Sequence, residues 1–244
     1  MNAQPNSNRR LRILRTHVAM FGFWSAVAKA LILLLDRLAS GRDNFDKKYG
    51  TDTKSLVPPE EANLPDEYTA DAVIYIPTAL ATVKHVFRNL PIKYEEFELI
   101  DLGAGKGRLV LLASDYPFAR IRGIELSPLL SGIATDNVKK YMQNPPRSLR
   151  CKRVEIQCAN AVDFSIPDSN IVFFLYNPFK GSVFEQCMDH IHRCAAKQPT
   201  REIYLAYVNP WPCEHWLRQS GYFALIEEFQ VIERHWSWSL WKHV

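Results

Sequence analysis

Apolar residues occur along the chain in short continuous runs, and these runs alternate with longer stretches in which apolar positions fall three and four residues apart. Apolar runs predict buried strands at 97–102 and 171–176, and further strands are expected at 119–125, 154–158 and 202–208. The helical spacing predicts helices at 78–90, 109–114, 129–142 and 183–195, the first with Thr78 as its N-cap. Strands that alternate with helices indicate a parallel sheet covered by helices on both faces.

The last part of the chain has a different pattern. Residues 223–231 and 233–244 form two strand-like runs with no helix between them, and Trp236, Trp238 and Leu240 alternate with serines. This period of two predicts an antiparallel hairpin at the edge of the sheet. The sequence therefore predicts an α/β fold: a doubly wound, mostly parallel seven-stranded sheet with an antiparallel C-terminal hairpin, preceded by an N-terminal helix.

Two further segments precede the domain expected at 72–244. Residues 1–40 form a basic and apolar arm, with four arginines between positions 9 and 15 and a stretch from Val18 to Leu35 whose only charge is Lys29. At about 1.5 Å per residue that stretch is roughly 27 Å long, just short of a bilayer core. Two interpretations of residues 9–35 remain open: packing on the domain or on a second copy as a homodimer, or peripheral contact with the inner membrane surface. Residues 41–71 are polar and contain three prolines, which predicts a loop or lid.

Composition narrows the choice of partners and compartment. Thirty Lys and Arg against 26 Asp and Glu give a net charge of +4, which does not indicate nucleic acid as a partner. The five cysteines include no C-x-x-C pair, so we expect a reducing compartment and a cytoplasmic protein. Cys187, His190, His192 and Cys194 match no usual zinc spacing, and we expect no metal site.

The strongest candidate chemistry lies after the first strand, in the run D-L-G-A-G-K-G-R from Asp101 to Arg108. Its glycines allow a tight turn and close approach of the backbone to a ligand. Arg108 stands where a dinucleotide fingerprint has glycine, and Lys106 is not followed by the Ser or Thr of a P-loop. Glu125 ends the next strand, where a carboxylate can accept both hydroxyls of a ribose.

Residues 68–244 resemble the class I, seven-strand, Rossmann-like methyltransferases, which use S-adenosylmethionine. The resemblance rests on L-I-D-L-G-A-G-K-G-R, I-R-G-I-E-L-S-P, C-A-N-A-V-D-F and L-Y-N-P-F. It implies S-adenosyl-L-methionine as the cofactor, with the methionine portion held by the loop, the ribose by Glu125 and the adenine between Asn160 and Ala161. Many relatives have Asp at the position of Asn160, whose amide oxygen can still accept a hydrogen bond. The cofactor-binding residues so implied are Asp101, Gly103, Ala104, Gly105, Gly107, Glu125, Leu126, Asn160 and Ala161.

Two other motifs resemble a subgroup of that family. Y-I-P-T, from Tyr75 to Thr78, looks like the Y-x-P-[ST] element of seven-strand protein-lysine methyltransferases. This resemblance adds Tyr75 and Thr78 to the cofactor site and implies a protein lysine as the methyl acceptor. F-D-K-K-Y-G-T-D-T, from Phe45 to Thr53, is similar to a segment of uncharacterised bacterial members.

The candidate catalytic residues Tyr176, Asn177, Pro178 and Phe179 follow the fourth strand. The Asn177 oxygen can accept a hydrogen bond from an incoming N–H, and the aromatic rings can wall a dry channel. Asn-Pro after a strand is also a common turn. Enzymes that methylate exocyclic or amide nitrogen often have N-P-P-[FY] here. This chain has only N-P-F, so the substrates of those enzymes cannot be assigned to it. The proton of an amine substrate can go to Asp163, Tyr75 or water.

The sequence therefore predicts an S-adenosylmethionine-dependent N-methyltransferase that acts on a protein lysine. Two alternatives remain: an RNA or DNA methyltransferase that contacts phosphates through its arginine arm, and a non-catalytic scaffold that binds the cofactor.

Overall fold

The computed structural model describes residues 44–231 and 236–244. The arm expected at 1–40 lies outside the described residues, as do residues 41–43 and 232–235. Within the described ranges, no helix combines the length and the apolar character that a membrane span requires.

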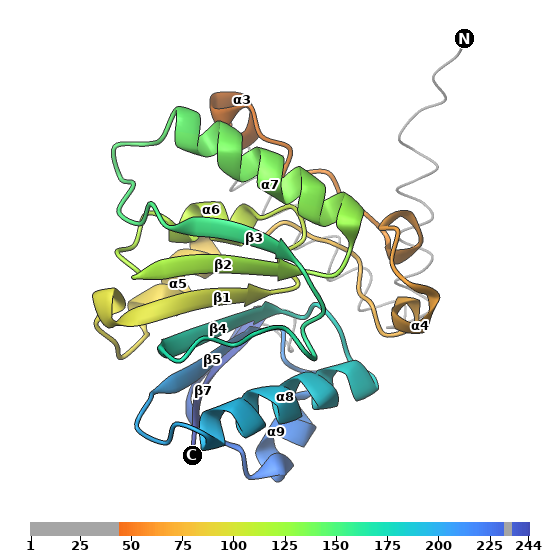
Figure 1. Ribbon diagram of the computed structural model, residues 1–244, viewed down its shortest axis with the longest axis vertical. Coiled ribbons are helices and arrows are strands. Elements are labelled where there is room, and N and C mark those ends of the chain that lie inside the picture. Colours follow the sequence, from red (N-terminus) through yellow and green to blue (C-terminus); the bar gives the residue numbers. More distant parts are fainter. Residues whose placement is uncertain (1–43, 232–235) are drawn as a thin grey trace. The chain divides into compact units, whose positions relative to one another are not determined.

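Seven strands form one sheet in the order β3-β2-β1-β4-β5-β7-β6 (Figure 1). The strands are β1 Phe97–Leu102, β2 Arg120–Glu125, β3 Val154–Cys158, β4 Asn170–Tyr176, β5 Ile203–Val208, β6 Phe223–Val231 and β7 Trp236–His243. Strands β1 to β5 pair in parallel, whereas β7 pairs antiparallel with both β5 and β6. This sheet confirms the expected α/β fold with its C-terminal hairpin.

The helices cover both faces of the sheet. They are α5 Leu80–Arg88, α6 Arg108–Ala113, α7 Pro128–Gln143, α8 Gly181–Ala196 and α9 Glu214–Ser220. Val172 and Phe174 of β4 pack in one buried cluster with α5 and α6, while Ile171 and Phe173 pack in another with α8. The alternation follows from the two-residue period of a strand, and it explains why β4 is apolar at nearly every position.

The segment expected as a loop or lid contains three short helices: α3 Phe45–Tyr49, η1 Pro59–Glu61 and α4 Asp66–Thr69. The helix expected from Thr78 begins instead at Leu80, and Ala79 is its N-cap. Thr78 is therefore not the helix cap; its backbone carbonyl accepts a hydrogen bond from Nε of Arg108 at 3.1 Å. Helix α9 was not predicted, because its seven residues are too few to establish a helical period.

The strand order reverses its direction between β1 and β4, so their carboxyl ends open a crevice at the edge of the sheet. The glycine loop follows β1, Glu125 ends β2, and Tyr176 ends β4. The fold thus brings the three candidate motifs to one place.

Candidate active site

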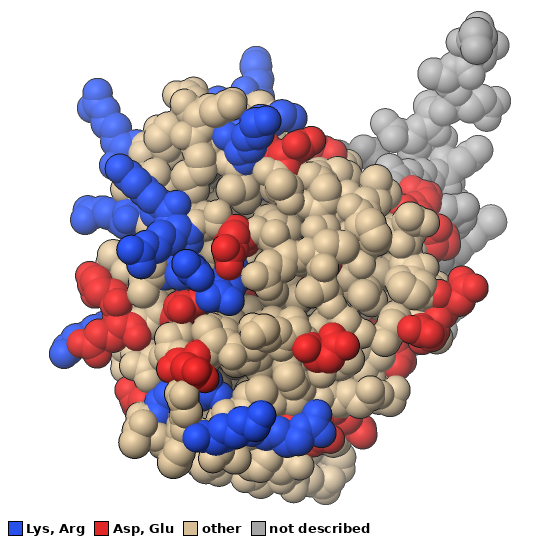
Figure 2. Space-filling view, in the orientation of Figure 1, with Lys and Arg blue, Asp and Glu red and all other residues tan. Residues whose placement is uncertain are grey.

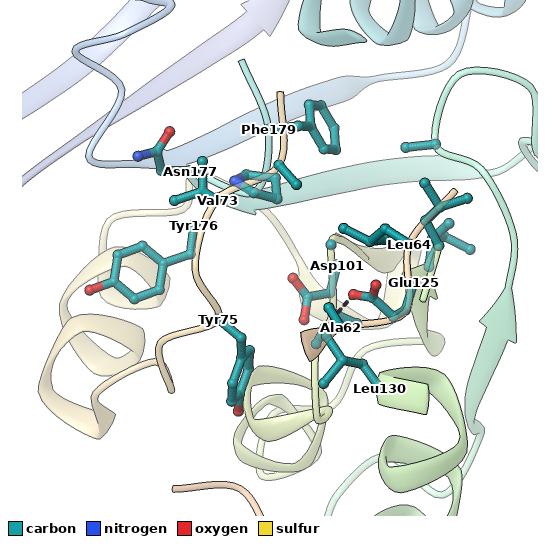
Figure 3. A pocket seen from close by; sticks show the side chains of 18 of the residues that line it. Ala62, Leu64, Val73, Tyr75, Asp101, Glu125, Leu130, Tyr176, Asn177 and Phe179 are labelled. Carbon is teal, nitrogen blue, oxygen red and sulfur yellow. Dashed lines mark hydrogen bonds between the residues drawn. The ribbon is translucent and has the colours of Figure 1, made fainter. Parts of the chain in front are cut away.

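A pocket lies at the carboxyl ends of β1, β2 and β4 (Figure 3). Fourteen of the fifteen residues expected in the site line it: Tyr75, Thr78, Asp101, Gly103, Ala104, Gly105, Glu125, Leu126, Asn160, Ala161, Tyr176, Asn177, Pro178 and Phe179. Gly107 does not line it. A Cβ at Gly107 would lie 3.2 Å from Cβ of Ala134, so this glycine lets α6 approach α7.

The glycine loop lies against two other pocket residues. Gly103 has φ +77° and Gly105 has φ +55°, both in the left-handed region that favours glycine. A Cβ at Gly103 would lie 2.2 Å from Cβ of Pro178, and one at Gly105 would lie 2.2 Å from the Tyr75 ring. The loop therefore closes against the end of β4 on one side and against an aromatic ring on the other.

Two buried carboxylates form one side of the pocket. The backbone N–H groups of Gly105 and Ser127 donate to the two oxygens of Glu125, at 2.7 and 2.8 Å. Asp101 lies beside Glu125 (Figure 3). Burial raises the pKa of Glu125. The backbone N–H donors partly offset this increase, because they stabilise the ionised carboxylate. Burial, together with the Glu125 charge, raises the pKa of Asp101 well above its ordinary value. The pair creates a site that favours a cation.

Tyr176 and Asn177 lie across the pocket from these carboxylates (Figure 3). Asn177 has φ +45°, a conformation that Asn adopts more readily than most residues. Its Oδ1 is buried and has no hydrogen-bond partner among the described residues. An unpaired buried oxygen is costly, and a ligand N–H that donates to it would remove that cost.

Residues 57–78, which we name the covering segment, lie over the pocket and are attached at both sides of it. On the β2 side Ser127 Oγ donates to the carbonyl of Ala62. On the β4 side the N–H of Val73 donates to the carbonyl of Pro178 at 3.3 Å. Val57, Ala62, Leu64, Tyr68 and residues 72–76 of this segment line the pocket. Of these only Tyr75 was expected.

Asn160 lines the pocket, but its amide already has protein partners. Its Nδ2 donates to the hydroxyl of Tyr68 at 2.8 Å, and its Oδ1 accepts from the N–H of Val162 at 3.2 Å. The side chain thus attaches the covering segment to the loop after β3.

Arg108, at the position where a dinucleotide fingerprint has glycine, contacts the segment that precedes the covering segment. Its side chain is buried, its NH1 donates to Oγ1 of Thr53 at 2.8 Å, and its guanidinium lies 4.8 Å from the centre of the Phe45 ring. Lys106 is equally buried, and its Nζ lies 2.8 Å from Oδ2 of Asp52. The F-D-K-K-Y-G-T-D-T motif therefore supplies partners for the two cations of the glycine loop.

The two residues considered as proton acceptors do not suit that role. The Tyr75 hydroxyl donates to the carbonyl of Thr53 at 2.8 Å, and burial raises the pKa of Tyr75. Asp163 is exposed and does not line the pocket. Of the three proton acceptors suggested by the sequence, water is therefore the one that remains.

The side chains of Cys187, His190 and His192 in α8 contact residues outside this helix. Cys187 is buried against the sheet, and burial raises the pKa of its thiol. His190 Nε2 lies 2.8 Å from the Phe164 carbonyl, and His192 Nδ1 lies 2.9 Å from Nε2 of His243. Among the described residues no group of three or more His, Cys, Asp or Glu side chains could hold a metal ion.

No protein-family model and no curated protein sequence matches this chain. Solved structures of similar fold include an RNA methyltransferase from Salinibacter ruber in complex with S-adenosyl-L-homocysteine, at 20% identity, over 69% of this chain and 94% of that one, with a TM-score of 0.47. A ribosomal protein L11 methylase from Lactobacillus delbrueckii subsp. bulgaricus is 10% identical over 66% of this chain and 76% of that one, with a TM-score of 0.48. A precorrin-6y C5,15-methyltransferase from Geobacter metallireducens is 18% identical over 76% of this chain and 95% of that one, also with a TM-score of 0.48. All three are named as methyltransferases or a methylase, and their names give three different acceptors.

Proposed function

We propose that this protein is an S-adenosylmethionine-dependent N-methyltransferase whose acceptor is a protein lysine side chain. The observation that carries the proposal is a single pocket lined by two buried carboxylates, the glycine loop and Asn177, whose buried amide oxygen has no partner among the described residues. The cofactor would lie on the carboxylate side, and the acceptor nitrogen would approach from the side of Asn177.

The residues present fit this cofactor. S-adenosylmethionine supplies an electrophilic methyl group on a sulfonium, and it also carries an ammonium group and a ribose diol. Glu125 has two lone pairs engaged by backbone N–H groups and retains others for ribose hydroxyls. Asp101 offers its carboxylate to the positive groups, and a nearby cation would favour its ionised form.

Methyl transfer requires alignment more than acid or base chemistry. When bound, the cofactor would supply the methyl group to the acceptor nitrogen, and its sulfonium would become a neutral thioether. Asn177 Oδ1, by accepting one N–H, would orient the lone pair toward the methyl group. Tyr176 and Phe179 line the pocket, and with both ligands bound their rings would limit the access of water, which would otherwise stabilise the charged reactants.

A lysine side chain suits the acceptor side of the pocket. The pocket lining includes the apolar side chains of Val73, Ile74, Ile76 and Val183. Such walls match the aliphatic stem of lysine, and burial lowers the pKa of its amine so that the nucleophilic neutral form is populated. The proton released by the methylated amine would go to water.

The test is transfer of tritium from methyl-labelled cofactor into a lysate that has been separated into protein, nucleic acid and small molecules. We expect label in protein and, after hydrolysis, in methylated lysine. Label in RNA or DNA would contradict the lysine proposal and favour nucleic acid. Cofactor binding without transfer to any fraction would favour a scaffold.

A further inference from the structure

The C-terminal end of α7 and the loop that follows carry an unusual concentration of positive charge. Residues 139–153 contain six Lys or Arg and no Asp or Glu, and all six cations are exposed: Lys139, Lys140, Arg147, Arg150, Lys152 and Arg153. Figure 2 shows blue side chains gathered on this part of the surface. We name these six residues, together with Lys47 and Lys48 of α3, the basic face.

The basic face is held in place by the fold. Tyr49 and Phe45 of α3 pack on Tyr141 of α7, with ring centres 4.6 and 5.6 Å apart. The backbone N–H groups of Arg150 and Cys151 both donate to the carbonyl of Ser114, at 2.8 and 3.0 Å. The cations of α3, α7 and the loop therefore project from a fixed surface.

Few acidic groups oppose these charges. Asp115 accepts from Ser148 Oγ at 2.8 Å, and Glu155 is paired with Arg122. Asp52 faces Lys140 but already binds Lys106. Asp136 is the other exposed acid near these residues on α7. Among the described residues, no ion pair is formed by the four cations of 147–153.

The basic face includes Lys47 and Lys48, which lie close to the first described residue in sequence. Helix α3 begins one residue after Asn44, and the sequence before it contains the arginines of 9–15 and the apolar stretch 18–35. An anionic lipid surface can bind both the cations and the apolar residues, because its head groups attract the cations and its acyl chains solvate the apolar side chains. Nucleic acid would use the cations alone, and Tyr141, the aromatic residue of 139–153, is buried and cannot stack on a base.

We propose that the basic face docks this protein on an anionic membrane surface. Because α7 begins at the end of β2 that lines the pocket and runs back along the sheet, its C-terminal end and the loop before β3 lie at the opposite ends of the strands (Figure 1). The membrane-bound enzyme would then present its pocket away from the lipid. Its acceptor would be a soluble protein or the extramembranous part of a membrane protein.

Co-sedimentation of the full chain with phosphatidylcholine vesicles, with and without phosphatidylglycerol, tests this docking. The test variant combines Arg147→Gln, Arg150→Gln, Lys152→Gln and Arg153→Gln. The matched control removes the same charge from exposed positions at α5 and α8, through Lys84→Gln, Arg88→Gln, Arg193→Gln and Lys197→Gln. Four lost cations should weaken binding to anionic vesicles by about 700-fold. The control should bind like the parent.

Three results would overturn the proposal: equal losses in the two variants, unchanged binding of the test variant, or tighter binding of an RNA oligomer than of anionic vesicles at physiological salt. Cofactor binding measured by calorimetry should be the same in the parent and in both variants, because none of these positions lines the pocket. Failure of docking is thereby distinguished from failure of the proposed methyltransferase.

Discussion

Glu125 accepts a hydrogen bond from the backbone N–H of Gly105, with 2.7 Å between Oε2 and the nitrogen. The acid at the end of β2 and the glycine loop after β1 are therefore one structural unit. Each orients the other: the loop donor fixes the carboxylate, and the carboxylate holds the loop in its left-handed turn. The predictions below follow from this unit and from the contacts around it.

The replacement Gly105→Ala should distort the pocket. The new Cβ would lie 2.2 Å from the Tyr75 ring, and φ at this position is +55°. Steric overlap and backbone strain together should lower the free energy of unfolding by about 2–4 kcal/mol. Urea unfolding followed by circular dichroism measures the loss. Gly221→Ala is the control, because φ is +70° there but nothing lies within 4 Å of the new Cβ. Equal losses at the two positions would mean that the Tyr75 contact is unimportant.

Replacement of Asp101 by Asn should stabilise the cofactor-free protein near neutral pH. Burial raises the pKa of Asp101 in the folded state, so this carboxyl destabilises the fold as the pH rises above its ordinary value of 3.8. The advantage of the variant should shrink as the pH falls through that value, because below it wild-type Asp101 is protonated in both states. Denaturant unfolding at a series of pH values measures this difference. Exposed Asp168→Asn is the control, and a pH-independent advantage for Asp101→Asn would contradict the assigned burial effect.

The variant Asn177→Gly should lose methyl transfer while retaining cofactor binding. Glycine tolerates the φ of +45°, so the fold keeps its stability and only the amide is removed. We expect kcat to fall roughly 100-fold through poorer alignment of the nucleophile. Steady-state kinetics with the acceptor found in the lysate experiment, together with calorimetry of cofactor binding, separate the two effects.

Asn209→Gly is matched to this variant, since Asn209 has φ +54° and does not line the pocket. Its kcat should equal that of the parent. A comparable fall in both variants would assign the effect to the backbone rather than to the Asn177 amide.

Removal of the Asp52 side chain should loosen the segment that precedes the covering segment. Asp52→Ala takes a charged partner from Lys106, whose side chain is buried. An incompletely paired buried ammonium should lower the free energy of unfolding by about 1–3 kcal/mol. Chemical denaturation measures the change, with Asp136→Ala on the exposed side of α7 as the control. A null result for Asp52→Ala would show that the ion pair does not stabilise this segment.

The strands were predicted closely because their sequence signals are local: β4 and β5 are runs of apolar residues, and β3 alternates apolar and polar positions. β1 and β3 have the predicted bounds, and β4 begins one residue earlier than expected. Local signals also misled: Thr78 looked like a helix cap, but its carbonyl is bound by Arg108, which is thirty positions away along the chain. A single sequence read locally does not reveal such a contact.

In the candidate site, too, the features next to strand ends were predicted, whereas those that depend on distant contacts were not. The glycine loop, Glu125 and Asn177 stand next to strand ends, so topology alone predicts that they meet. A loop or lid was expected at 41–71, but most pocket contacts of the covering segment were not predicted, because its partners are distant in sequence, as between Tyr68 and Asn160. The signal that could have revealed the segment before it was Asp52, whose partner is the buried Lys106 of the glycine loop.

Calorimetric titration of S-adenosylmethionine into the parent protein and into Glu125→Ala tests the central claim most directly. We predict one binding site in the parent and a loss of about 1.5–3 kcal/mol of binding free energy in the variant, because charge-assisted hydrogen bonds to the ribose disappear. Unchanged affinity in Glu125→Ala, or no binding to the parent, would contradict the assignment of this pocket to the cofactor.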